Sequence, residues 1–104
     1  MLITAMNDVP GYEISEVYGE VFGLAIRYHS RFKAIEAEGE EGMNKKLVAF
    51  RQEAQDRLTE AAEAKGANAV IAFRFDSSDL AGYATEICAC GTAVTVEKEH
   101  RSAP

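Results

Sequence analysis

The sequence predicts an α+β fold in which a small, antiparallel-rich sheet carries one long amphipathic helix. Two observations support this class. Stretches rich in β-branched and aromatic residues stand before and after a single segment whose apolar residues recur at helical spacing, and turn-forming residues divide the last stretch into two strands. The expected order is two strands, a helix and two further strands, with the final pair forming a hairpin.

The first half of the chain contains a short apolar run and one long strand. The run Leu2–Ala5 stops at the turn sequence NDVPG. Tyr12–Tyr28 then continues without proline and has apolar residues at both parities, which is typical of a strand covered on both faces. Its glycines, Gly19 and Gly23, indicate bulges or a close approach of backbone. A short helical turn over Ser30–Ala37 is expected next.

One long helix is predicted from Asn44 to Lys65. Asn44 is a suitable N-cap, and Gly66 is a suitable left-handed terminator. The acidic stretch before the helix, Glu36–Glu41, lacks the ligand spacing of a calcium loop and is expected to be a solvated loop. The apolar face of the helix consists of Leu47, Phe50, Ala54, Leu58, Ala61 and Ala62.

The second half is expected to form the hairpin. A strand over Ala67–Asp76 is followed by a turn over Ser77–Gly82 and by the last strand, Tyr83–Val96. Residues 1–104 are predicted to form a single domain with a core of about residues 12–96, and residues 97–104 form a polar tail. The alternation of the first strand of the hairpin places Ile71, Phe73 and Phe75 on one face, and Val70, Ala72, Arg74 and Asp76 on the other.

Composition excludes several classes of partner. The chain has 104 residues, a formal net charge of -6 and 47% hydrophobic residues. Binding of nucleic acid or of an anionic membrane needs concentrated Lys and Arg, which the chain lacks. The N-terminus has no signal-peptide pattern, and no apolar run approaches the roughly 20 residues that span a bilayer. A cytoplasmic protein with reduced thiols is therefore expected.

Three blocks of the sequence resemble the YbjQ-like family, whose members are often labelled heavy-metal-binding domains. The blocks are YGEVFGLAI (Tyr18–Ile26), AKGANAVIAFRFD (Ala64–Asp76) and GTAVTV (Gly91–Val96), and the resemblance extends over about Tyr12–Val96. It implies a compact α+β subunit that assembles into a ring, typically a homopentamer. The family shares no catalytic constellation, so the resemblance implies a protein that is not an enzyme.

The chain departs from this family at three places. The acidic segment EGEEG stands where the family usually has Gly-Gly-Arg between its short and long helices. Arg74 replaces the first of two alternating acids in the strand after GANAV, so that only Asp76 remains. The two cysteines, Cys88 and Cys90, occupy positions where small polar or aromatic residues are common.

Glu86, Cys88 and Cys90 share one face of the last strand and are the candidate metal ligands. Alternate Cα atoms lie roughly 6.6 Å apart, whereas two sulfurs on one tetrahedral metal lie about 3.8 Å apart, a gap that rotamer choice can close. Two thiolates with a carboxylate suit Zn²⁺, and two thiolates alone suit Cu(I). A complete zinc site needs further ligands, for which Asp76 and a histidine, His29 or His100, are the candidates.

Two interpretations that involve no metal compete with the metal site. Free cysteine commonly packs as a small buried hydrophobe, which is the favoured interpretation of Cys88 and Cys90. A structural or partner-binding oligomer without metal is then the alternative function. The small residues Ala89, Gly91 and Ala93 share a face and permit close packing of a helix or a neighbouring strand, which fits an assembly surface better than a ligand pocket. A strand disulfide between the cysteines is excluded by their spacing, and neither a thioredoxin-type motif nor a catalytic motif is present.

Overall fold

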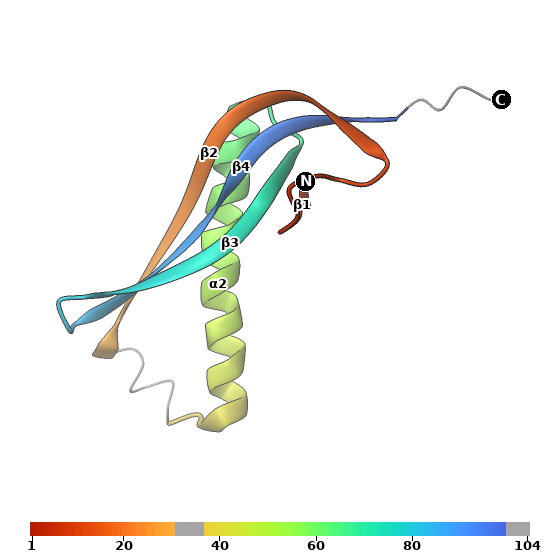
Figure 1. Ribbon diagram of the computed structural model, residues 1–104. Coiled ribbons are helices and arrows are strands. Elements are labelled where there is room, and N and C mark those ends of the chain that lie inside the picture. The colour runs from red at the N-terminus through yellow and green to blue at the C-terminus, as the bar shows by residue number, and fades with distance from the viewer. Residues whose placement is uncertain (31–36, 100–104) are drawn as a thin grey trace.

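The computed structural model describes residues 1–30 and 37–99. It confirms the α+β class and the order of elements, with a sheet in which β1 lies next to β3, β3 next to β4, and β4 next to β2 (Figure 1). β1 runs parallel to β3, and the other pairs are antiparallel. The elements are β1 (Leu2–Ile3), β2 (Tyr12–Tyr28), α2 (Gly39–Ala64), β3 (Ala69–Leu80) and β4 (Ala84–Lys98).

Strand β2 has the predicted bounds and pairs along its whole length with β4, from Tyr12 opposite Lys98 to Tyr28 opposite Ala84. Two irregularities interrupt this register, and Gly19 lies at the second of them with a φ of +102°. A positive φ of this size is readily adopted only by glycine. The expectation of a bulge at a glycine is therefore confirmed.

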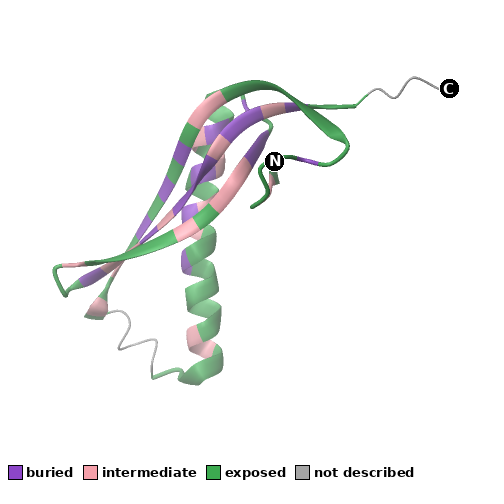
Figure 2. Cartoon of the chain, viewed as in Figure 1, coloured by how far each residue is buried: buried purple, intermediate pink, exposed green. Residues whose placement is uncertain are grey.

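Helix α2 packs on one face of the sheet, called here the inner face (Figures 1 and 2). Gly23 of β2 allows the close approach, because a Cβ atom there would lie 2.0 Å from the Ala54 carbonyl oxygen and 2.3 Å from the Leu58 nitrogen. The core between the two layers is formed by α2 residues Phe50, Ala54, Leu58 and Ala62 and by sheet residues that include Val21, Ala25, Val70, Ile87, Ala89 and Ala93.

The small residues of β4 permit the close packing of a helix, as expected, and that helix is α2 of the same chain. Ala89 and Ala93 are buried under α2. A Cβ atom on Gly91 would lie 2.5 Å from Cγ1 of Val70. The small side chains are therefore explained by the tight packing of this chain on itself.

The helix begins earlier than predicted. It starts at Gly39 rather than at Asn44, with Glu38 at the N-cap and no side-chain capping hydrogen bond. Glu40 and Glu41, predicted to lie in a loop, occupy the first turn, where their charges interact favourably with the helix dipole. The helix ends where predicted, since Lys65 is its C-cap and Gly66 has a φ of +88°.

Strand β3 contains a bulge that the simple alternation did not anticipate. The register shifts between Ile71 and Arg74, and Ala72 adopts a φ of 52°. Phe73 and Phe75 therefore pack on the inner core, whereas Ile71 packs on the other side with Ala69, and the prediction that these three apolar residues share a face is wrong. β3 also runs through the predicted turn to Leu80.

The outer face of the sheet, opposite α2, is covered only at one end. There the N-terminal segment contributes Val9, which packs with Ala69, Val94 and Val96. Further along β2 the outward side chains Phe22, Leu24, Ile26 and Tyr28 are exposed (Figure 2). The prediction that β2 is covered on both faces is therefore wrong for the single chain. The predicted helical turn over Ser30–Ala37 falls mostly outside the described residues.

Candidate functional site

The two cysteines lie on the open part of the outer face. Cys88 and Cys90 alternate along β4 with Glu86, as the spacing predicted, and both are free thiols. β4 lies between β2 and β3 in the sheet, so each of these residues has a paired residue on both neighbouring strands. The neighbours form three rows across β2, β4 and β3: Phe22–Cys90–Arg74, Leu24–Cys88–Asp76 and Ile26–Glu86–Ser78.

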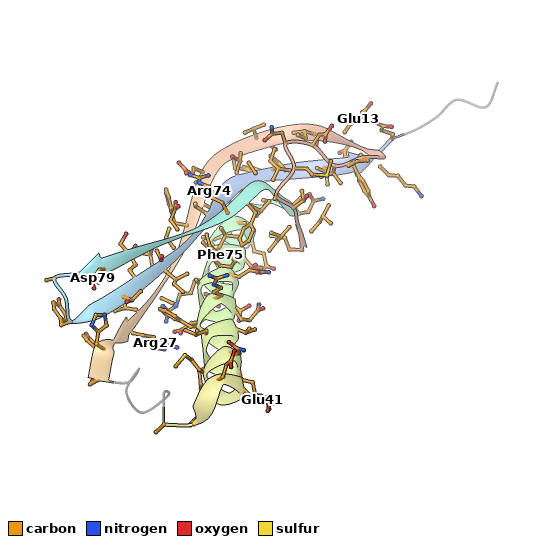
Figure 3. The ribbon with its side chains drawn as sticks, turned by 60° about the horizontal axis from the view of Figure 1, so that its bottom comes forward. Glu13, Arg27, Glu41, Arg74, Phe75 and Asp79 are labelled. Carbon is orange, nitrogen blue, oxygen red and sulfur yellow. The ribbon has the colours of Figure 1, made fainter. Side chains whose placement is uncertain are left out.

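Cys90 is almost completely buried even though α2 lies on the other face of the sheet. Only 1% of its surface is exposed. Its Sγ lies 3.7 Å from the Arg74 carbonyl oxygen and 4.0 Å from Oδ2 of Asp76. The Arg74 guanidinium lies 3.3 Å from Glu20 of β2 and 3.8 Å from Asp76, on the side of the sheet away from α2 (Figure 3). The ion pairs of Arg74 with Glu20 and Asp76 therefore lie next to the Cys90 thiol.

Cys88 is half-buried, and the pKa of its thiol is raised. Burial raises the pKa of Cys88, and the neighbouring Cys90 raises it further through its charge and a side-chain hydrogen bond. The carboxylates of Glu86 and Asp76 also raise the pKa of Cys88 through their negative charge. The thiol is therefore protonated at neutral pH, and a metal ion that binds it must displace the proton.

Of the remaining candidate ligands, Asp76 lies beside Cys90, but His29 does not. Among residues 1–30 and 37–99, no group of three or more His, Cys, Asp or Glu side chains is arranged to hold a metal ion. The Nε2 atom of His29 lies 3.3 Å from the Thr85 hydroxyl and 3.5 Å from Asp79, near the hairpin end of the sheet. His100 lies outside the described residues.

Sequence reasoning missed the role of Glu20 and Arg74 at this site. The alternation places Arg74 on one face with Asp76 but indicates no partner for it, and Glu20 lies 54 residues away from it in the chain. Their meeting depends on the bulge in β3, which turns Arg74 toward the outer face. The open face around the thiols therefore carries three acids, Glu20, Asp76 and Glu86, and one base.

The two thiols and the nearby carboxylates meet some of the requirements of a thiophilic metal ion. The two thiols share one face of β4, with Glu86 on the same face, and Oδ2 of Asp76 lies 4.0 Å from Sγ of Cys90. Two adjacent thiolates satisfy a two-coordinate Cu(I), while tetrahedral Zn²⁺ would need carboxylate ligands as well. Asp76 would have to leave Arg74 in order to bind a metal.

A solved structure shares this arrangement of one helix and a mixed sheet. The crystal structure of a protein with unknown function of the DUF74 family, from Pediococcus pentosaceus, superposes with a TM-score of 0.59 at 16% sequence identity. The match covers 93% of this chain and 98% of the other. At this identity the likeness shows the fold alone, a small α+β subunit with one long helix.

The sequence comparisons show the family. The YbjQ family model, described as "Putative heavy-metal-binding", matches residues 1–97. A UPF0145 protein of Streptomyces coelicolor is 44% identical over 95% of this chain and 100% of its own length, and one of Mycobacteroides abscessus is 44% identical over 93% and 97%. The chain therefore belongs to the YbjQ family, as the sequence blocks predicted. The names of these relatives state no activity.

No helix within the two described segments has both the length and the apolar character needed to cross a membrane.

Proposed function

We propose that this protein is a non-enzymatic, cytoplasmic homo-oligomer that binds a thiophilic metal ion through Cys88 and Cys90. The observation that carries the proposal is the pair of free thiols on the sheet face opposite α2, where Cys88 is half-buried and Cys90 is buried. The thiols share this face with the carboxylates of Glu86 and Asp76. Soft thiolate ligands favour Cu(I) and Zn²⁺ over hard cations.

Self-assembly is supported by the apolar surface that the single chain leaves open. Four side chains on the outer face of β2 are between 45% and 55% exposed, although all four are apolar or aromatic. They are Phe22, Leu24, Ile26 and Tyr28. We propose that a second copy covers them, and that the assembly is the homopentameric ring that the resemblance implies. In a ring each thiol pair is repeated by symmetry, and a neighbouring copy can supply further ligands.

One observation favours a second function, a structural or partner-binding oligomer without metal. Cys90 is nearly inaccessible beside the pair formed by Arg74 and Glu20. A thiol in this position also serves as a small apolar side chain, which is common for free cysteine. The two functions differ in whether the thiols bind a metal ion and agree on assembly.

Metal uptake by the reduced protein tests the first function. The protein is purified without chelator or affinity metal, and its metal content and affinity for Zn²⁺ and Cu(I) are measured by elemental analysis and chelator competition. We expect about one equivalent of metal bound at micromolar affinity or better, and at least a tenfold loss of affinity for Cys88→Ser or Cys90→Ser. Ser77→Ala, on an exposed part of β3, is the control and should bind as the wild type does.

The same experiment distinguishes the metal ions and the two functions. A Zn²⁺ site weakens in Glu86→Gln, because the carboxylate is a ligand, whereas a two-thiolate Cu(I) site does not. Failure of the reduced wild type to take up either metal would reject the metal site and leave the structural oligomer.

A further inference from the structure

Arg74 stands beside the thiol pair and holds a carboxylate that the metal site would otherwise use. It is the residue of β3 paired with Cys90, and its side chain is 56% exposed. Its Nε lies 3.8 Å from Oδ2 of Asp76, and the same oxygen lies 4.0 Å from the Cys90 Sγ. One carboxylate oxygen is therefore shared between the guanidinium and the thiol.

This shared oxygen limits the ligands that are available to a zinc ion. A closed zinc site in a protein has four ligands in tetrahedral geometry. Cys88, Cys90 and Glu86 supply three donors on one face of β4, and Asp76 is the fourth donor next to them. Asp76 can bind a metal ion only if its ion pair with Arg74 breaks. Two thiolates alone, in contrast, satisfy Cu(I) without any change at Arg74.

The charge of the bound complex separates the two ions further. When the thiols bind a metal ion, each S–H bond breaks, the proton leaves to solvent and a sulfur–metal bond forms. The two thiolates then carry two negative charges. Cu(I) neutralises one of them, so its complex is an anion, whereas Zn²⁺ neutralises both. A nearby guanidinium, which is always charged, stabilises the anionic complex and has no net charge to stabilise in the neutral one.

The rows around the thiols leave this compensation to Arg74. Among the described positions of these three rows across β2, β4 and β3, Asp76 and Glu86 are acidic and Arg74 is the only base. Glu20, the other partner of Arg74, adds a third carboxylate to the same surroundings. Without Arg74 the negative complex with Cu(I) would face acids alone, and Asp76 would be free to bind Zn²⁺.

We propose that Arg74 determines the specificity of the thiol pair and makes it select a soft monovalent ion, Cu(I), over Zn²⁺. Arg74 binds no metal itself. It acts through Asp76, which it holds away from the metal, and through the charge that it places beside the thiolates. This inference rests on the proposed metal binding and specifies the ion that is bound.

The ratio of the affinities for the two ions tests the role of Arg74. The affinities of the reduced protein for Cu(I) and for Zn²⁺ are measured separately, without oxygen, by competition with chelators of known affinity. Arg74→Gln removes the charge, and Arg74→Lys keeps it. Lys98→Gln is the control, because it removes the same charge from the exposed far end of β4. Circular dichroism verifies that each variant is folded.

We expect Arg74→Gln to lower the ratio of Cu(I) affinity to Zn²⁺ affinity by about tenfold or more, because Cu(I) loses its compensating charge and Zn²⁺ gains a ligand. Arg74→Lys should keep most of the ratio, and Lys98→Gln should keep all of it. Adding Asp76→Asn to Arg74→Gln should abolish the gain in Zn²⁺ affinity, because the released carboxylate is then missing.

The outcomes separate this inference from the metal site itself. A wild type that binds Cu(I), with an unchanged ratio in Arg74→Gln, would overturn the role of Arg74 and leave the thiol site standing. An equal change in Lys98→Gln would assign the effect to general charge and would also overturn it. A wild type that binds neither ion would overturn both the inference and the proposed metal binding.

Discussion

Gly23 is the residue at which β2 and α2 come closest. Because a Cβ atom at this position would lie 2.0 Å from backbone of α2, the helix has to move to admit even a methyl group. We predict that Gly23→Ala lowers the free energy of unfolding by about 1–3 kcal/mol or more, as overpacking does. Chemical denaturation measures this change. Ser78→Ala, a small change on the outer face, is the control, and an equally stable Gly23→Ala would contradict the packing.

Cys88 is the residue whose titration reports on the candidate site. Its pKa is raised by burial first, then by Cys90 and by the charge of Glu86. We predict that Glu86→Gln lowers the pKa of Cys88, because a neutral amide no longer opposes the thiolate. The ultraviolet absorbance of the thiolate, followed against pH in a Cys90→Ser background, measures the shift.

The matched control for this titration is Glu97→Gln, which removes the same charge from the exposed end of β4. It should leave the Cys88 titration unchanged. Equal effects of the two substitutions would mean that general charge, rather than the position of Glu86, determines the titration. The raised pKa also means that metal binding, which removes the thiol proton, strengthens as the pH rises from neutral.

At the scale of elements, the sequence predicts those features that depend on local periodicity and turn chemistry. The bounds of β2 and the end of α2 at Gly66 followed from such signals. The start of α2 did not, because Gly39 begins the helix without a side-chain cap. The bulge at Ala72 was also missed, since a positive φ at alanine has no sequence signal, and this bulge places Arg74 and Asp76 beside the thiols.

At the candidate site, too, the sequence predicts the local features but not the long-range ones. The shared face of Glu86, Cys88 and Cys90 followed from the two-residue period of a strand. The approach of Glu20 to Arg74 could not be foreseen, because it requires the register of β2 and β3 on either side of β4. Long-range pairing of this kind is set by the whole sheet rather than by any local segment.

At the scale of the whole molecule, the single chain is elongated and incompletely covered. Its radius of gyration is 17.2 Å, against about 13 Å for a compact domain of roughly this length. Burying the exposed remainder of Phe22, Leu24, Ile26 and Tyr28 would contribute about 3–6 kcal/mol before the costs of association. An uncovered face of this kind marks an interaction surface in a soluble protein. The sequence indicated an apolar strand but not that its outer side chains stay exposed in the single chain.

Native mass spectrometry of the reduced protein, loaded separately with Zn²⁺ and with Cu(I), tests the central claim most directly because it measures assembly and metal content together. We predict a homopentamer with about one metal ion per chain, and the same pentamer without metal for Cys88→Ser/Cys90→Ser. A monomer would contradict the proposed assembly. A pentamer that carries neither metal, or equal metal content in the wild type and the double variant, would contradict the thiol site.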